Sequence, residues 1–407
     1  MTPAELSWTV LTTVRRAVAA DELRVDVPEK VVVQRPPRPG CGDYATNVAL
    51  QLAGAAGRSP YEVAAILAPR LAREPGIAQV EIAGAGFLNI TLSARAYADV
   101  VRQVREQGAS YGRGDGLAGQ HVTVVPDVSS QGAPPLRAGV VAEAVNALLR
   151  AAGAEPGPPE PLRVTEPHGI DPALAPGTPA PLGTAPRETA PGGAPGGTAP
   201  GGVPGAPAPR ETAPGGGTPA PGAPAPRDTA PGGGTPAPRT PTPRGSRLGP
   251  DEVRWALLRP PGEDVPRLDA GALLAQREAN PLFRVRYAHA RTRALLRNAQ
   301  DLGVRIEDPA GGDPYRHPAE TELLGLVADF PRVVETAARR RAPDRLARHL
   351  ERLADAFLRF QDECPVLPKG DEKPSAVHAA RTRLADATGI VLADGLHLLG
   401  ISAPDHL

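Results

Sequence analysis

The sequence predicts a multidomain α+β protein whose two folded ends are joined by a long linker. Three observations predict this organisation. Helix and strand patterns alternate over residues 1–155, a Pro/Gly/Ala/Thr-rich composition fills 156–247, and helical periodicity covers 248–407 almost throughout. The 407 residues include 51 prolines and 45 glycines, which are concentrated in the middle segment, so only the two ends can build a hydrophobic core.

Residues 1–93 are expected to form a small α/β module. An amphipathic helix fits 2–20, because Leu6, Val10 and Val14 recur on one face. Strands are expected at 31–34 and within 77–93, and two helices lie between them. Ser59 followed by Pro60 is a good start for the second of these helices, because serine caps the free N–H groups and proline suits the first turn.

Residues 94–155 contain a connector and then a strand, loop and helix. The strand is predicted at 121–128, a Gly/Pro/Ser break follows, and helical spacing runs from 140 to 149. A helix N-terminus directs free backbone N–H groups at an anion, so this segment could bind phosphate. The loop itself carries none of the side chains that such sites use.

The linker at 156–247 contains three near-copies of the sequence PRETAPGG and hardly any large apolar residue. Such a segment cannot offset an ordering cost of ~1–2 kcal/mol per residue, so we expect it to be disordered. A flexible chain of ~90 residues has a root-mean-square reach of roughly 50–60 Å, which makes it a tether between the folded ends.

Residues 248–407 are expected to form an antiparallel bundle of five or six helices. The stretch between Asn280 and Asn298 carries five arginines and no acid, which indicates a basic face along RNA, although a solvated helix face is the alternative. The candidate residues in this stretch are Arg284, Arg286, Tyr287, His289, Arg291, Arg293 and Arg297. A second basic cluster at 339–352 is expected to be a solvated face.

Formal charge is balanced, with 45 basic and 45 acidic residues, so no global attraction to nucleic acid or anionic membrane is expected. Cys41 and Cys364 lie in different halves of the chain and make no disulfide framework, which fits a reducing compartment. No signal sequence and no apolar run of ~20 residues are present. We therefore expect a monomeric cytoplasmic protein with no membrane or DNA partner and no metal.

Several stretches together resemble arginyl-tRNA synthetases, which are class I aminoacyl-tRNA synthetases. They are GDYATNVALQLA at 42–53, IAGAGFLNITL at 82–92, LGPDEVRWALL at 248–258, NPLFRVRYAHARTRALL at 280–296 and CPVLP at 364–368. The resemblance implies a tRNA-binding domain at 1–93, a remnant of the Rossmann-type catalytic fold at 94–155, and a helical DALR-type anticodon-binding domain at 248–407. The linker has no counterpart in the family.

The resemblance also implies that Asn47, Phe87 and Asn89 contact the D-arm of a tRNA. A flat aromatic ring beside amides suits an unstacked base, which is read by stacking and by hydrogen bonds to its edges. The alternative is that Phe87 belongs to the core and that the asparagines cap turns.

The family's nucleotide motif is degenerate here. SSQGAPPLRAGV at 129–140 occupies its place, and the resemblance aligns Gln131 with an asparagine, Pro134 with a lysine, and Arg137 and Val140 with the two histidines, while Gly139 persists. Those histidines stabilise charge on the ATP phosphates, which requires donors preset at the anion. Arg137 could still supply charge, but Val140 cannot.

The second catalytic element of the family, a Lys-Met-Ser-Lys loop, has no match. Met1 is the only methionine and no lysine occurs between Lys30 and Lys369. The leading hypothesis is therefore a catalytically inactive relative that binds tRNA, with tRNA-Arg as one candidate, and uses no cofactor. The alternatives are an arginine–tRNA ligase that uses ATP and arginine, and a protein-interaction scaffold.

Overall fold

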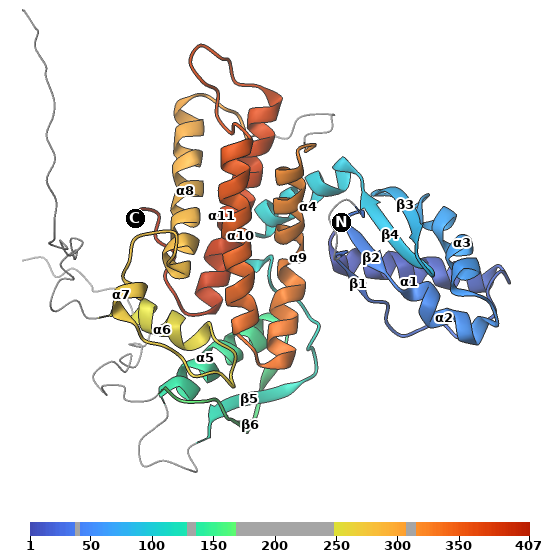
Figure 1. The fold of residues 1–407 in the computed structure, drawn as a ribbon, viewed down its shortest axis with the longest axis horizontal. Helices are drawn as coiled ribbons and strands as arrows, with labels where there is room; N and C mark the ends of the chain where they lie inside the picture. The colour runs from blue at the N-terminus through green and yellow to red at the C-terminus, as the bar shows by residue number, and fades with distance from the viewer. Residues whose placement is uncertain (37–40, 128–135, 168–247, 307–314) are drawn as a thin grey trace, which may run out of the picture. The chain divides into compact units, whose positions relative to one another are not determined.

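A computed structural model describes residues 1–36, 41–127, 136–167, 248–306 and 315–407 (Figure 1). The predicted disorder of the linker falls mostly on 168–247, which lies outside the described residues. Among the described helices, none is both long and apolar enough to span a bilayer.

The N-terminal module is a four-stranded antiparallel sheet with three helices. Its elements are α1 (Pro3–Ala19), β1 (Val33–Gln34), β2 (Tyr44–Thr46), α2 (Val48–Ala56), α3 (Pro60–Leu71), β3 (Ile77–Ala83) and β4 (Phe87–Leu92). The sheet order is β1-β2-β4-β3. The expected helix at 2–20 is confirmed, and Ser59 caps α3 as predicted, in a capping box with Glu62.

The central segment contains α4 (Ala94–Gln107), a short 3₁₀ turn η1 (Gly108–Ser110), β5 (His121–Pro126), α5 (Leu136–Ala151) and β6 (Glu155–Leu162). The predicted strand and helix are confirmed, and the helix is longer than its apolar period suggested, while the predicted loop at 128–135 lies outside the described residues. β6 pairs with β5 in parallel and lies inside the segment assigned to the linker from residue 156. That boundary was wrong, because the chain stays paired with β5 through Leu162, with one register shift between His121 and Thr123.

The sheet formed by β5 and β6 has only these two strands within the described chain. Beside β5, the amide of Asn146 on α5 donates to the Val124 carbonyl at 2.8 Å and accepts the Val124 N–H at 2.8 Å. β6 carries four prolines, at positions 156, 158, 159 and 161. The remnant of the predicted nucleotide-binding fold is therefore a strand pair packed on one helix.

The C-terminal part is helical, as predicted, and six helices are described in it: α6 (Pro250–Leu258), α7 (Ala270–Leu273), α8 (Pro281–Asp301), α9 (Pro318–Arg340), α10 (Asp344–Glu363) and α11 (Ala376–Leu398). Helices α8 to α11 run side by side (Figure 1). Fully buried side chains such as Phe330, Leu350, Phe357 and Phe360 fill the space between them. This packing rather than local propensity holds the bundle together.

Candidate nucleic-acid interface

Strand register gathers the N-terminal candidates on one side of the sheet. Thr46 pairs with Leu88 in the β2–β4 ladder, so Asn47, which follows Thr46, comes next to Phe87, which precedes Leu88. Phe87 and Asn89 are two residues apart on β4 and share a face, whereas Leu88 between them is buried. The three residues therefore form one patch, which we call the β4 patch.

The side chains of the β4 patch are available to a ligand. Phe87 is 41% exposed, so it is not the core residue of the alternative interpretation. Asn47 precedes α2 without a side-chain cap bond, and the Asn47 and Asn89 amides have no hydrogen bond within the described residues. Before Phe87, Gly86 has φ 133° and a Cβ there would meet the Pro60 carbonyl at 2.7 Å, so the turn against α3 requires glycine.

The Asn-Pro pair before α8 is structural. The Asn280 side chain is buried, accepts the N–H of Leu282 at 3.1 Å and donates to the carbonyls of Leu273 and Ala275. His289 is also buried, its Nδ1 lies 2.9 Å from the Pro404 carbonyl, and burial lowers its pKa. Asn280 and His289 are both buried, so packing within the protein explains this part of the motif.

The arginines of α8 are engaged within the protein. Arg286 pairs with Asp251 and Glu252 and its side chain is only 13% exposed. Arg284 pairs with Asp355 at 2.7 Å, and Arg293 with Asp405 at 3.1 Å. The remaining two lie against neutral or weakly basic partners, Arg291 against Gln361 at 3.3 Å and Arg297 against His406 at 3.4 Å. The acid-free run is thus partly neutralised by acids from elsewhere in the chain.

Tyr287 keeps one ring face free. It is partly exposed, and Phe283, one turn earlier, stacks on it with ring centroids 5.8 Å apart and an interplanar angle of 15°. A base could stack only on the opposite face of Tyr287. Its contact with RNA stays a prediction, as do those of the α8 arginines.

The phosphate site predicted at the N-terminus of α5 is closed by the chain itself. The Glu166 carboxylate accepts the backbone N–H of Arg137 at 2.9 Å and that of Ala138 at 2.8 Å. They belong to the second and third residues of the helix, whose first-turn N–H groups an external anion would use. An internal carboxylate therefore occupies the position where a phosphate was expected.

Arg137 does not supply charge to a ligand. The residue is 0% exposed, and its guanidinium donates to six backbone carbonyls. The acceptors belong to Thr165, Leu257, Pro260, Pro261, Gly262 and Asp264, at 2.5–3.4 Å. The expectation that Arg137 could still serve a nucleotide was therefore wrong, because this side chain is the polar core of the junction between α5 and α6.

The other described positions of the degenerate motif, Gly139 and Val140, add no donor. Val140 is buried, and the surroundings of Gly139 leave open space where a Cβ would stand. Gln131 and Pro134 lie outside the described residues. Glu166 was missed by sequence reasoning, since nothing local connects it with a helix that begins 30 residues earlier.

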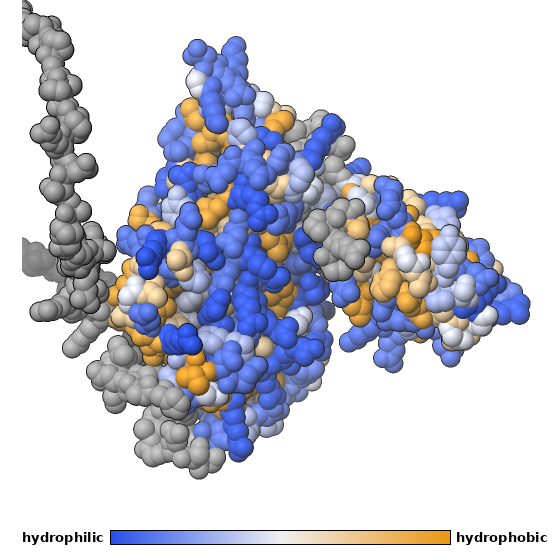
Figure 2. All heavy atoms as spheres, viewed as in Figure 1, coloured by the Kyte–Doolittle hydropathy of each residue, from blue (hydrophilic) through white to orange (hydrophobic). Residues whose placement is uncertain are grey.

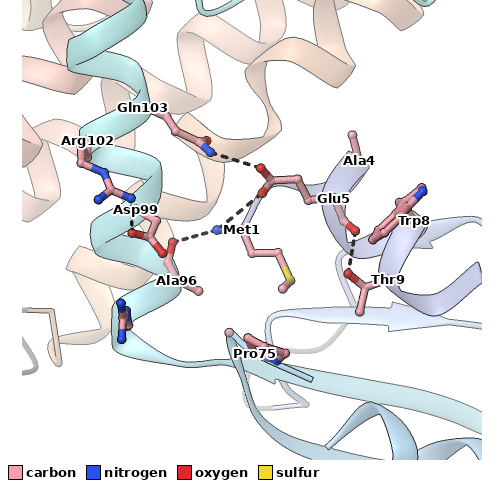
Figure 3. A pocket seen from close by; sticks show the side chains of 12 residues that line it. Met1, Ala4, Glu5, Trp8, Thr9, Pro75, Ala96, Asp99, Arg102 and Gln103 are labelled. Carbon is pink, nitrogen blue, oxygen red and sulfur yellow. Dashed lines mark hydrogen bonds and ion pairs between the residues drawn. The ribbon is translucent and has the colours of Figure 1, made fainter. Parts of the chain in front are cut away.

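A pocket of about 960 Å³ lies between α1 and α4 (Figure 3). The Met1 ammonium donates to the Ala96 carbonyl at 2.8 Å, and Glu5 accepts from Gln103 at 3.1 Å. Trp8 is exposed at its edge. Its lining carries three positive groups, the Met1 ammonium, Arg95 and Arg102, against the carboxylates of Glu5 and Asp99, and Asp99 pairs with Arg102.

Comparison with known families covers both ends of the chain. The family described as "Arginyl tRNA synthetase N terminal domain" matches residues 10–92, which include the β4 patch. The family described as "DALR anticodon binding domain" matches residues 285–407, from within α8 to the last residue.

An arginine–tRNA ligase of Frankia alni is 32% identical over 553 residues, in an alignment that takes in all of both chains. The chain belongs to the arginyl-tRNA synthetase family. A second arginine–tRNA ligase, of Paenarthrobacter aurescens, is 31% identical over 561 residues, again with both chains fully covered. Since the present chain has 407 residues, these relatives contain segments to which this member of the arginyl-tRNA synthetase family has no counterpart.

Two solved arginyl-tRNA synthetases share the fold. The Thermus thermophilus enzyme superposes with a TM-score of 0.58 at 14% identity, over 100% of each chain. The Plasmodium falciparum enzyme gives a TM-score of 0.59 at 8% identity, over 100% of this chain and 99% of its own. At these identities, the two superpositions show only that this arginyl-tRNA synthetase family member shares the fold.

Proposed function

We propose that this arginyl-tRNA synthetase family member binds tRNA, with tRNA-Arg as the first candidate, and does not activate arginine. In this proposal the N-terminal module contacts the D-arm through the β4 patch, and the DALR domain contacts the anticodon arm. No ATP is used, and the protein acts as a cytoplasmic tRNA-binding factor. Membership of the family supports tRNA as the partner, because both matched family models describe parts that serve tRNA synthetases.

The observation that carries the proposal is the contact of Glu166 with the start of α5. Adenylate formation needs preset donors at the ATP phosphates. Here the two N–H groups at this position already bind a carboxylate, and the Arg137 guanidinium is buried among carbonyls. An ATP phosphate at this place would have to displace an internal, charge-assisted contact, and neither Arg137 nor Val140 offers it a side-chain donor.

The β5 edge adds an independent argument. A class I catalytic domain requires a larger parallel sheet, which would have to extend from β5 or β6. The N–H and carbonyl of Val124 are both taken by the Asn146 amide, so a third strand has no free ladder groups at this residue. In the described part of the chain the parallel sheet is therefore limited to β5 and β6.

Arginine–tRNA ligase activity is the second candidate. It is favoured by the names of the relatives, which are arginine–tRNA ligases aligned over the whole of this chain. In that case ATP and arginine are substrates, and the catalytic groups come from residues other than Arg137 and Val140.

Arginine-dependent ATP–pyrophosphate exchange separates the two candidates. The purified full chain is assayed at saturating arginine with and without tRNA, with the Frankia alni ligase as positive control. We expect exchange at background and a salt-sensitive shift of tRNA in the same preparation. Exchange above background would establish the ligase, and absence of any tRNA shift would refute the tRNA-binding proposal.

A further inference from the structure

We propose that an arginine surface on α9 and α10 binds the phosphate backbone of RNA. We call it the α9–α10 arginine surface and define it by Arg332, Arg340, Arg345, Arg348 and Arg352. The inference rests on the proposed tRNA-binding function and adds the place where most of the charge-driven affinity arises. It reverses the expectation from the sequence, which favoured α8 and treated 339–352 as a solvated face.

Helix geometry aligns these side chains. On α10, Arg345, Arg348 and Arg352 are spaced three and four residues apart, so they project from one face at intervals of ~4.5 and ~6 Å along the axis. All three are exposed. Such intervals are comparable to the spacing of neighbouring phosphates along one nucleic-acid strand, so consecutive phosphates can each meet a guanidinium.

The surface is hollowed in two adjoining places. One hollow, of about 420 Å³, is lined by Arg340, Arg345 and Arg348 together with the end of β6. The other, of about 590 Å³, is lined by Arg332, Arg345, Arg348 and Arg352. Arg345 and Arg348 line both, so the two hollows adjoin at these arginines. Along α10, the face turned to the viewer in Figure 2 is predominantly hydrophilic.

The positive charge of this surface is only partly compensated. Arg332 pairs with Asp329 and Arg348 with Asp344. Arg340, Arg345 and Arg352 have no carboxylate within ion-pair distance among the residues that the structure describes. On α8, by contrast, three of the five arginines are held by carboxylates. Among the described residues, three arginines of the α9–α10 arginine surface therefore lack a carboxylate partner, against two on α8.

The chemistry of the lining favours a nucleic-acid backbone over a protein partner. The second hollow contains no aromatic residue, and besides its charged residues it offers only Val333 and Thr336. A protein interface would be expected to provide aromatic or large apolar anchors. Planar guanidinium groups match phosphate oxygens, and such contacts fix position without reading sequence. The surface is thus suited to the backbone of an RNA stem.

The test compares two triple variants with the same loss of charge. Arg340→Gln, Arg345→Gln and Arg352→Gln remove the uncompensated arginines of the proposed surface. Arg291→Gln, Arg293→Gln and Arg297→Gln remove three arginines from α8. Binding of tRNA is measured between ~50 and ~200 mM salt. We expect the first triple to weaken binding at least ~10-fold and to flatten the log–log salt slope by ~2–3, at ~0.7–0.9 per contact.

The α8 triple is expected to change affinity less than ~3-fold with little change of slope. A third variant, with lysine at positions 340, 345 and 352, keeps the charge and should retain most of the slope, which guards against a folding defect in the glutamine variant. Equal binding by the two glutamine triples, with tRNA still bound by the parent, overturns this inference alone. Displacement of tRNA by polyglutamate as readily as by unrelated RNA also overturns it, in favour of an acidic polypeptide. If the parent binds no tRNA, the proposed function fails as well.

Discussion

The Glu166 carboxylate accepts the backbone N–H of Arg137 at 2.9 Å. This bond connects Glu166, in the segment after β6, to the first turn of α5. It also places a negative charge at the positive end of the helix dipole, where charge is stabilising. The feature that suggests a nucleotide site in the sequence is therefore a structural cap in the folded protein.

Glu166→Ala is expected to lower the free energy of unfolding by about 1–2 kcal/mol, because two helix N–H groups lose a charged acceptor. Urea denaturation measures the loss, and Glu155→Ala, an exposed acid on β6, should change stability by less than about 0.5 kcal/mol. Added phosphate should restore part of the lost stability in the Glu166 variant by binding the freed N–H groups. Equal stability of both variants would remove the capping role.

Arg137→Met should be far more damaging. The variant leaves six carbonyls without their donor, and loss of one partner from a buried charged network costs ~3–5 kcal/mol. Arg163→Met, at an arginine whose side chain is 85% exposed, is the matched control and should be nearly neutral. Thermal melts of the two variants check this, and a stable Arg137 variant would show that the guanidinium is dispensable to the fold.

Local sequence signals account for much of the fold. Both capping boxes of the N-terminal module, Thr2 with Glu5 and Ser59 with Glu62, use residues three positions apart, and the amphipathic periods beside them are equally local. β6 was missed because proline is disfavoured in strands, and only its parallel partner β5 makes it one.

The site was less predictable, because the decisive contacts are distant in sequence. The run around Arg286 shows five basic residues, whereas its partner Asp251 lies 35 residues away. The cluster at 339–352 looked like a solvated face, and its excess charge emerges only when α9 and α10 pack together. The shared face of Phe87 and Asn89, by contrast, could be anticipated, since alternate residues of a strand lie on the same side.

The β4 patch should contribute base contacts. Asn47→Ala combined with Phe87→Ala is expected to weaken tRNA binding by roughly 10- to 100-fold, since stacking alone is worth ~1–3 kcal/mol per base. The salt slope should stay nearly unchanged, because no phosphate contact is lost. Fluorescence titrations at several salt concentrations provide the measurement. Trp8→Ala, which removes another exposed aromatic from the same module, is the control and should bind like the parent.

Asp394 gives the stability a pH dependence. It lies on α11, is 5% exposed and has its Oδ2 without a hydrogen-bond partner in the described part of the chain, and burial raises its pKa to about 6. The folded state thus binds its proton more tightly than the unfolded state does. The contribution of the Asp394 carboxyl to the free energy of unfolding is favourable below its pKa in the unfolded state, and it is lost as pH rises to about 6.

Asp394→Asn should therefore raise the free energy of unfolding at pH 7.5 by roughly 1–3 kcal/mol and flatten its decline between about pH 4 and pH 6. Denaturation midpoints across this range test the prediction, with Asp371→Asn, an exposed acid, as the control. A variant less stable than the parent at pH 7.5 would mean that the ionised carboxylate has a stabilising partner.

The two-stranded sheet has a consequence for solubility. Free strand edges are templates for pairing between molecules, and a short parallel pair cut from a larger sheet would expose two. On β6, prolines remove backbone donors from four positions, and on β5 the Asn146 amide occupies both groups of Val124. A second molecule can add no regular ladder at these positions. The remnant sheet is thereby protected from self-association through its strand edges.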